Sequence, residues 1–119
     1  MIFKESRPIY LQIADKMCDE ILSGQYVEEG RIPSVREYAA LVEVNPNTIV
    51  RTFEYLQTSD IIFNKRGMGY FVKEGAKENI RTMRKRDFLK VMLPDVFAEM
   101  KILDIGIDEV VELYDKTNE

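Results

Sequence analysis

Two helix-start signals only eleven residues apart restrict what this chain can fold into. Ser34 followed three residues later by Glu37 forms a capping box, which predicts a helix beginning at Val35. Asn45 is a strong N-cap residue, and Pro46 suits the first position of a helix because no amide donor is needed there. The sequence therefore predicts two short helices joined by a tight turn, the helix-turn-helix arrangement.

Apolar residues at helical spacing predict which side of each helix faces the core. For the first helix they are Tyr38, Ala39, Leu41 and Val42, and for the second Ile49, Val50, Phe53 and Leu56. Asn47, Thr48 and Arg51 point the other way. Residues at this tip of a second helix are those that read base edges in helix-turn-helix proteins.

The flanking segments complete a winged helix. Pro8 opens a first helix with an apolar stripe at Ile9, Ile13, Met17 and Ile21, and Gly24 ends it. Residues 1–7 are predicted as an extended arm and residues 25–32 as a loop. After the second helix, residues 61–64 and 70–73 are rich in β-formers and enclose the glycine-containing turn 65–69, which predicts a β-hairpin with a basic tip.

The character of the chain changes after residue 75. A long helix is predicted over residues 78–100, kinked or divided at Pro94, and Asp108 is predicted to cap a last short helix after Gly106. About 44 residues are too few to enclose both a core and a ligand pocket. The predicted class is α+β, mainly α: a winged helix-turn-helix domain over residues 1–75 and a helical dimerisation tail over residues 76–119.

Composition excludes several kinds of function. The chain has no histidine and one cysteine, Cys18, so we expect no disulfide, metal site or catalytic dyad, no cofactor and no enzymatic activity. No apolar run approaches the roughly 20 residues of a membrane span, and charges at the N-terminus do not fit a signal peptide, so we expect a cytoplasmic protein. The net charge is −4, but residues 31–73 carry six basic and four acidic side chains, a local balance of +2. Any DNA-binding surface must therefore be a local patch.

Five motifs occur in the order found in one family: residues 8–13, 21–24, 33–37, 44–48 and 67–72. In these segments the chain resembles the GntR family of bacterial transcription regulators. The Asn-Pro-Asn-Thr segment and the short helical tail are similar to its YtrA-type branch. The resemblance implies a dimeric DNA-binding regulator, usually a repressor, with a C-terminal half for dimerisation or effector sensing.

The resemblance also implies roles for individual residues. Arg36 would contact a base or the backbone, Ser34 would contact phosphate, and Gly69 would let the wing approach the minor groove. The candidate DNA-contacting residues are Ser34, Arg36, Asn45, Asn47, Thr48, Arg51, Lys65, Arg66 and Gly69. Many relatives carry arginine where this chain has Pro46 and Val50, so its base readout is expected to differ.

Structural roles compete with these assignments. Arg36 could be a solvated surface arginine, Asn47 and Thr48 could only cap a helix, and Lys65 and Arg66 could keep an exposed hairpin soluble. Cys18 is interpreted as a small buried residue rather than a redox switch.

The main hypothesis is a homodimeric repressor that binds a pseudo-palindromic operator through residues 1–75 and dimerises through residues 76–119. The alternative is a winged helix that binds only proteins and has no salt-dependent affinity for DNA. A third hypothesis keeps the DNA role and adds a small-molecule effector, on which the sequence does not decide.

Overall fold

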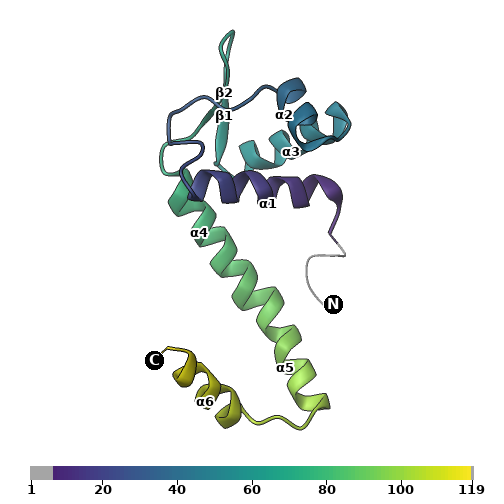
Figure 1. The fold of residues 1–119 in the computed structure, drawn as a ribbon, viewed down its shortest axis with the longest axis vertical. Coiled ribbons are helices and arrows are strands. Elements are labelled where there is room, and N and C mark those ends of the chain that lie inside the picture. Colours follow the sequence, from purple (N-terminus) through teal and green to yellow (C-terminus); the bar gives the residue numbers. More distant parts are fainter. Residues whose placement is uncertain (1–6, 119) are drawn as a thin grey trace. The chain divides into compact units, whose positions relative to one another are not determined.

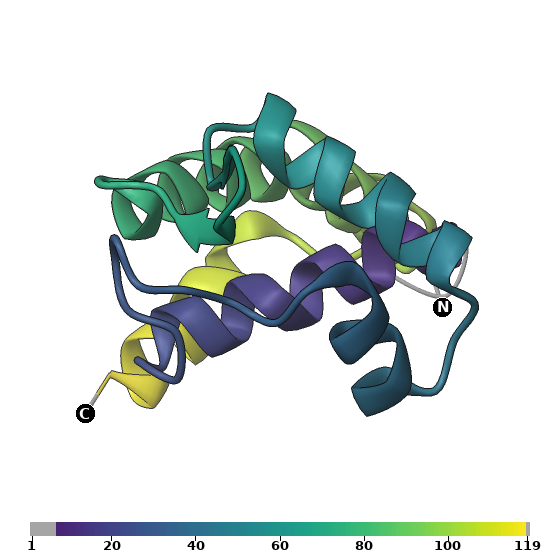
Figure 2. The ribbon, with the colours of Figure 1, turned by 90° about the horizontal axis from the view of Figure 1, so that it is seen from above.

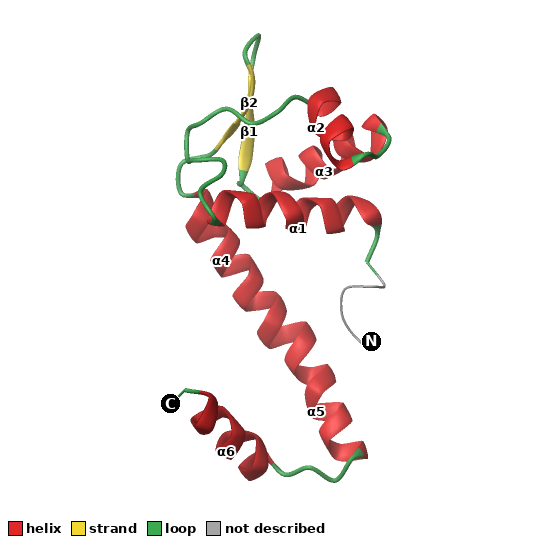
Figure 3. Ribbon diagram, in the orientation of Figure 1, coloured by secondary structure: helices red, strands yellow, loops and turns green. Residues whose placement is uncertain are grey.

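A computed structural model of the protein describes residues 7–118 and confirms the winged-helix architecture (Figure 1). The predicted arm at residues 1–7 lies, apart from Arg7, outside the described residues. The elements are α1 (Ile9–Leu22), α2 (Val35–Val42), α3 (Pro46–Thr58), β1 (Ile62–Lys65), β2 (Gly69–Val72), α4 (Ala76–Asp87), the π-helical segment η2 (Phe88–Met92), α5 (Leu93–Ile102) and α6 (Ile107–Thr117). Figure 3 shows that the two strands form a single hairpin after α3. The chain divides into two compact units, one ending at Arg84 and one beginning at Lys85.

The local signals for helix ends at Ser34, Asn45 and Gly24 are confirmed. The Ser34 hydroxyl accepts a hydrogen bond from the Glu37 amide at 3.1 Å, and the Glu37 carboxylate accepts one from the Ser34 amide at 2.9 Å. Asn45 caps α3, whose first residue is Pro46. Gly24 follows the end of α1 with a φ of +91°, a left-handed conformation that glycine adopts without a steric cost.

The core of the first unit forms where α1 and α2 pack against α3 and the hairpin adds Ile62 and Val72. Ile13, Met17 and Ile21 of the predicted stripe are buried there. Burial raises the pKa of the Cys18 thiol to about 12, which supports its interpretation as a core residue.

Three apolar residues predicted to face this core are instead exposed: Ile9 (56%), Leu41 (66%) and Val50 (41%). At about 100° per residue, Leu41 and Val50 fall outside the arcs that their buried helix neighbours define. The polar residue Thr52 falls inside the buried arc of α3. Its hydroxyl lies 2.8 Å from the Tyr10 carbonyl oxygen and 3.1 Å from that of Thr48, so this buried group has acceptors within reach.

The wing is a two-stranded antiparallel hairpin, shifted by one residue from the predicted strands. Ile62 pairs with Val72 and Lys65 with Gly69. Part of the predicted loop 25–32 runs beside β2: Arg31 forms a β-bridge with Phe71, and the Ile32 amide donates to the Tyr70 carbonyl at 3.0 Å. The predicted loop is confirmed, since residues 25–32 form no helix or strand. The isolated bridge within it, which was not predicted, satisfies backbone groups of β2 that would otherwise lie at an open edge.

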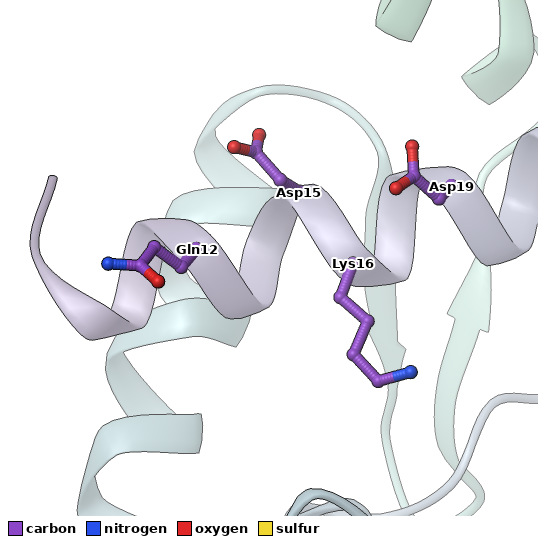
Figure 4. A pocket seen from close by; sticks show the side chains of 4 residues that line it. All are labelled: Gln12, Asp15, Lys16 and Asp19. Carbon is purple, nitrogen blue, oxygen red and sulfur yellow. The ribbon is translucent and has the colours of Figure 1, made fainter. Parts of the chain in front are cut away.

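The beginning of α4 belongs to the first unit. Ala76 and Ile80 are fully buried in its core. Arg84 forms an ion pair with Asp19 at 2.8 Å and donates to the Asp15 carbonyl oxygen at 3.1 Å. Figure 4 shows the carboxylates of Asp15 and Asp19 on the same side of α1, and these two residues line a surface pocket together with Gln12 and Lys16. The division into a DNA-binding domain over residues 1–75 and a dimerisation tail over residues 76–119 stays a prediction.

The second unit starts with the last residues of α4, Lys85 to Asp87, and continues without a gap into the π-helical segment η2. The Leu93 amide donates to the Phe88 carbonyl oxygen, five residues back. Pro94, which has no amide donor and whose ring clashes with a preceding carbonyl in an α-helix, lies in the first turn of α5, so the wider turn accommodates it. Asp108 was predicted to cap α6, but the N-cap is Gly106, whose amide donates to the Glu109 carboxylate at 3.2 Å. Among the described residues, no helix is long and apolar enough to cross a membrane.

Glu28 holds the N-terminus of α4 in place. Its carboxylate accepts hydrogen bonds from the Gly75 and Lys77 amides at 3.0 and 3.1 Å. These amide donors favour the charged form and lower the pKa of Glu28 from its ordinary value of 4.5. Since the pKa is lower in the folded state, this contribution to stability is complete above about pH 4.5 and is lost as the pH falls through the folded-state pKa.

We therefore expect Glu28→Gln to lower the melting temperature at pH 7 and to flatten the loss of stability below pH 4.5. Thermal unfolding followed by circular dichroism between pH 7 and pH 3 measures both effects. Glu54→Gln, at an exposed position of α3, is the control. Equal melting temperatures for Glu28→Gln and the control at pH 7 would contradict the capping role.

Candidate nucleic-acid interface

The turn between α2 and α3 fixes the geometry of the helix-turn-helix. Glu43 ends α2 in the left-handed conformation, with a φ of 58°, and the Val44 amide donates to the Ala39 carbonyl at 3.1 Å. Asn45 then caps α3, so only three residues separate the helices. Tyr38 and Phe53, whose ring centroids are 6.1 Å apart, pack the two helices together.

The N-terminal end of α3 presents polar groups at the surface. The Asn45 side-chain oxygen accepts from the Asn47 amide at 2.8 Å, which leaves its NH₂ group available. Asn47 is exposed and Thr48 half-buried. Neither side chain forms a hydrogen bond within residues 7–118. The competing interpretation, in which Asn47 caps α3, loses support because Asn45 fills that position.

Arg51 lies one turn further along α3, at an exposed position. Its guanidinium carbon is 4.2 Å from the centroid of the Tyr10 ring of α1. Stacking on an aromatic face restricts the side chain and leaves the edge of the guanidinium group free for hydrogen bonds. Nothing in the spacing of the sequence indicated this contact, since the two residues lie on different helices.

Ser34 and Arg36 lie at the N-terminal end of α2. The Ser34 hydroxyl accepts a bond within the capping box, and its own proton remains available to an acceptor such as a phosphate oxygen. Arg36 is exposed, and across the described part of the chain its guanidinium group forms no hydrogen bond or ion pair. An arginine without a carboxylate partner is available to an anionic ligand.

The wing carries the remaining candidates. The Lys65 amine lies 5.6 Å from the centroid of the Phe71 ring, and the Phe63 and Phe71 rings stack at 5.8 Å. Arg66 is exposed in the turn at the tip. Gly69 begins β2 with a φ of +104°.

Arg31 is a basic residue of this surface that was absent from the predicted site. A Cβ atom at Gly69 would lie 3.4 Å from the Arg31 Nε and 3.5 Å from its Nη2, so the guanidinium group lies against the glycine. One feature of the sequence could have indicated Arg31 as a candidate: it is a basic residue three positions before Ser34, which begins the capping box of α2. Its position against the wing depends on the pairing of residue 31 with β2.

The wing and helices α2 and α3 lie on the same side of α1 (Figure 1), and Figure 2 views this side from above. The first unit thus brings the nine predicted residues and Arg31 to three neighbouring elements. These supply guanidinium, ammonium, amide and hydroxyl donors, the groups that contact phosphates and base edges in DNA.

Gly69→Ala tests whether the wing needs glycine. A φ of +104° is strained for any residue with a Cβ atom, at a cost of about 1–3 kcal/mol. We expect faster amide hydrogen exchange in β1 and β2 with little change in α1 and α3. Gly67→Ala, at a φ of +79° in the open turn, is the comparison. Unchanged exchange in β2 of Gly69→Ala would mean that the wing tolerates a side chain at this position.

Comparison with known proteins agrees with the winged-helix fold. Residues 9–72 match the family model described as bacterial regulatory proteins, gntR family. The chain is 36% identical over 110 residues to the uncharacterized HTH-type transcriptional regulator YhcF of Bacillus subtilis, covering 92% of this chain and 89% of YhcF. It is 32% identical over 103 residues to the HTH-type transcriptional repressor YtrA of the same organism, covering 83% and 79% of the two chains. The crystal structure of a putative GntR-family regulator from Bacteroides thetaiotaomicron is 54% identical, has a TM-score of 0.83, and covers 92% of this chain and 96% of that one.

Proposed function

The chain belongs to the GntR family of bacterial regulatory proteins, and from this premise we propose that it is a cytoplasmic repressor that binds a pseudo-palindromic operator as a homodimer. Its relatives are DNA-binding transcription regulators and not enzymes, as predicted. The repressor role is supported by the similarity to YtrA of Bacillus subtilis, whose name describes a repressor.

The observation that carries the proposal is the polar, exposed start of α3. In the proposed complex this end of α3 enters the major groove, where the Asn47 amide can pair with an adenine edge. Thr48 is next to Asn47, Arg51 lies one turn further along α3, and the two complete the readout. Ser34 and Arg36 at α2, with Lys65 and Arg66 on the wing, then contact the backbone or flanking bases and fix the register.

The proposal of a homodimer is supported by the surface of the second unit. None of the residues of α5 and α6 is buried within the chain. Large apolar side chains are exposed there: Phe88, Leu89, Val91, Phe97, Ile102, Leu103, Ile105, Ile107, Val111, Leu113 and Tyr114. Soluble monomers rarely leave so much apolar surface uncovered, and a second copy would cover it. A twofold dimer would place two α3 helices about 34 Å apart along one face of the DNA.

Selection from random double-stranded DNA with the purified full-length protein, followed by sequencing of the bound pool, tests the proposal. We expect enrichment of an inverted repeat whose half-sites are about one helical turn apart. Affinity for that repeat should fall steeply as salt rises, because bound phosphates release counterions. Failure to enrich any sequence at low salt would contradict the proposal and favour a winged helix that binds only proteins, or a regulator that requires an effector first.

A further inference from the structure

We propose that Arg31 binds a backbone phosphate of the DNA, at the point where the wing meets the N-terminus of α2. This inference rests on the proposed function, and it adds a residue and a role that the sequence did not assign.

The pairing of the strands defines the face on which Arg31 lies. Residues directly opposite one another in an antiparallel ladder project their side chains to the same side, as do residues two apart on a strand. Arg31 is bridged to Phe71, which is paired with Phe63, so these three side chains share one face with Lys65. The opposite face carries Ile62 and Val72, which are buried, and Tyr70, which packs on Phe53 at 4.9 Å. Arg31 therefore lies on the outer face of the wing.

This outer face is basic and is held in place. The backbone on both sides of Arg31 is hydrogen-bonded to β2, through Val72 to Gly30 at 2.9 Å and through Ile32 to Tyr70 at 3.0 Å. The guanidinium group lies along Gly69, where no side chain intervenes. A basic group held in position loses less conformational freedom on binding than a mobile one.

The charge of Arg31 is not neutralised by an ion pair with any residue between 7 and 118. Arg31 acts electrostatically on Glu37, whose pKa is lowered mainly by hydrogen bonds from Ser34 and to a smaller extent by Arg31. One oxygen of the Glu37 carboxylate, Oε1, accepts a hydrogen bond from the Ser34 amide at 2.9 Å. Arg31 thus lies between the wing and the capped start of α2, both of which already carry predicted phosphate contacts, and it would join them into one continuous track along a DNA strand.

The test compares full-length wild type, Arg31→Gln and Arg31→Lys for binding to the selected operator between 50 and 200 mM salt. Each phosphate contact contributes about 0.9 to the slope of log affinity against log salt, so losing one contact in each subunit should reduce the slope by about two. The ratio of the wild-type affinity for the operator to that of Arg31→Gln should then fall about tenfold between 50 and 200 mM salt. Arg31→Lys should restore most of the slope, since it keeps the charge. Arg81→Gln, an exposed arginine on α4, is the matched control.

The outcomes separate this inference from the proposed function. A steep slope for the wild type and the same slope for Arg31→Gln would overturn the role of Arg31 while leaving the regulator intact. A loss confined to particular flanking sequences would also overturn it, because a phosphate contact carries no sequence information. A wild type without salt-dependent binding would instead defeat the proposed function. Equal melting temperatures of the variants confirm that the changes in binding do not come from misfolding.

Discussion

A chain that ends at Asp87 is expected to be a folded monomer that has lost most of its affinity for the operator. The cut removes the apolar surfaces of η2, α5 and α6 and keeps α4, whose Ala76 and Ile80 complete the core of the first unit. It also keeps Arg84, which is bonded to Asp15 and Asp19 of α1. In a dimer, binding of one subunit to its half-site holds the other subunit close to the second half-site, at a high effective concentration. A monomer lacks this advantage, so its affinity for the full operator should be about 10²- to 10⁴-fold lower.

Light scattering gives the mass of the shortened chain, and titration with operator DNA gives its affinity. DNA that contains a single half-site is the control, because the full chain and the shortened chain should bind it almost equally. A shortened chain that still runs as a dimer would place the interface in the first unit. A cut at residue 75 is unsuitable as a test, since it would remove Ala76 and Ile80 and expose the core.

The second large effect is expected for Arg36→Ala. Arg36 is exposed and forms no hydrogen bond or ion pair within the described chain, so its removal should leave the melting temperature unchanged. A contact with a base edge is worth about 1–3 kcal/mol, and a homodimer loses it twice. The affinity for the full operator should therefore fall by at least about 30-fold.

Competition between the selected operator and operators with single base changes locates the contact of Arg36. If it contacts a base, one position of the operator loses its discrimination in the variant, whereas a backbone contact weakens binding to every sequence alike. Arg81→Ala serves as the control for a lost surface arginine. A folded Arg36→Ala protein with wild-type affinity would remove this residue from the interface.

Some features followed from the sequence because their physical causes are local. The capping box at Ser34 and the cap at Asn45 depend on groups two or three residues away, so a short pattern contains all that is needed. The wing followed similarly from two short β-forming runs around a glycine turn. The family resemblance, carried by motifs in the first 73 residues, is confirmed by the match over residues 9–72.

Other features could not be read from periodicity. A helical stripe indicates which residues are apolar, but the width of the covered face depends on the neighbours, so Leu41 and Val50 are exposed and Thr52 is buried. The cap of α4 is supplied by Glu28, 47 residues before Gly75 in the chain, and no local pattern links the two.

The sequence alone therefore determined where the helices of the helix-turn-helix begin, that a hairpin follows them, and which polar residues form the tip of α3. Only the tertiary structure decided how those parts are joined into one surface, with Arg51 stacked on Tyr10 and Arg31 lying against Gly69. The reason is that capping and turn formation are governed by hydrogen bonds within a few residues. The contacts between distant segments instead exist only after burial of the core has fixed the hairpin, α1 and α3 against one another.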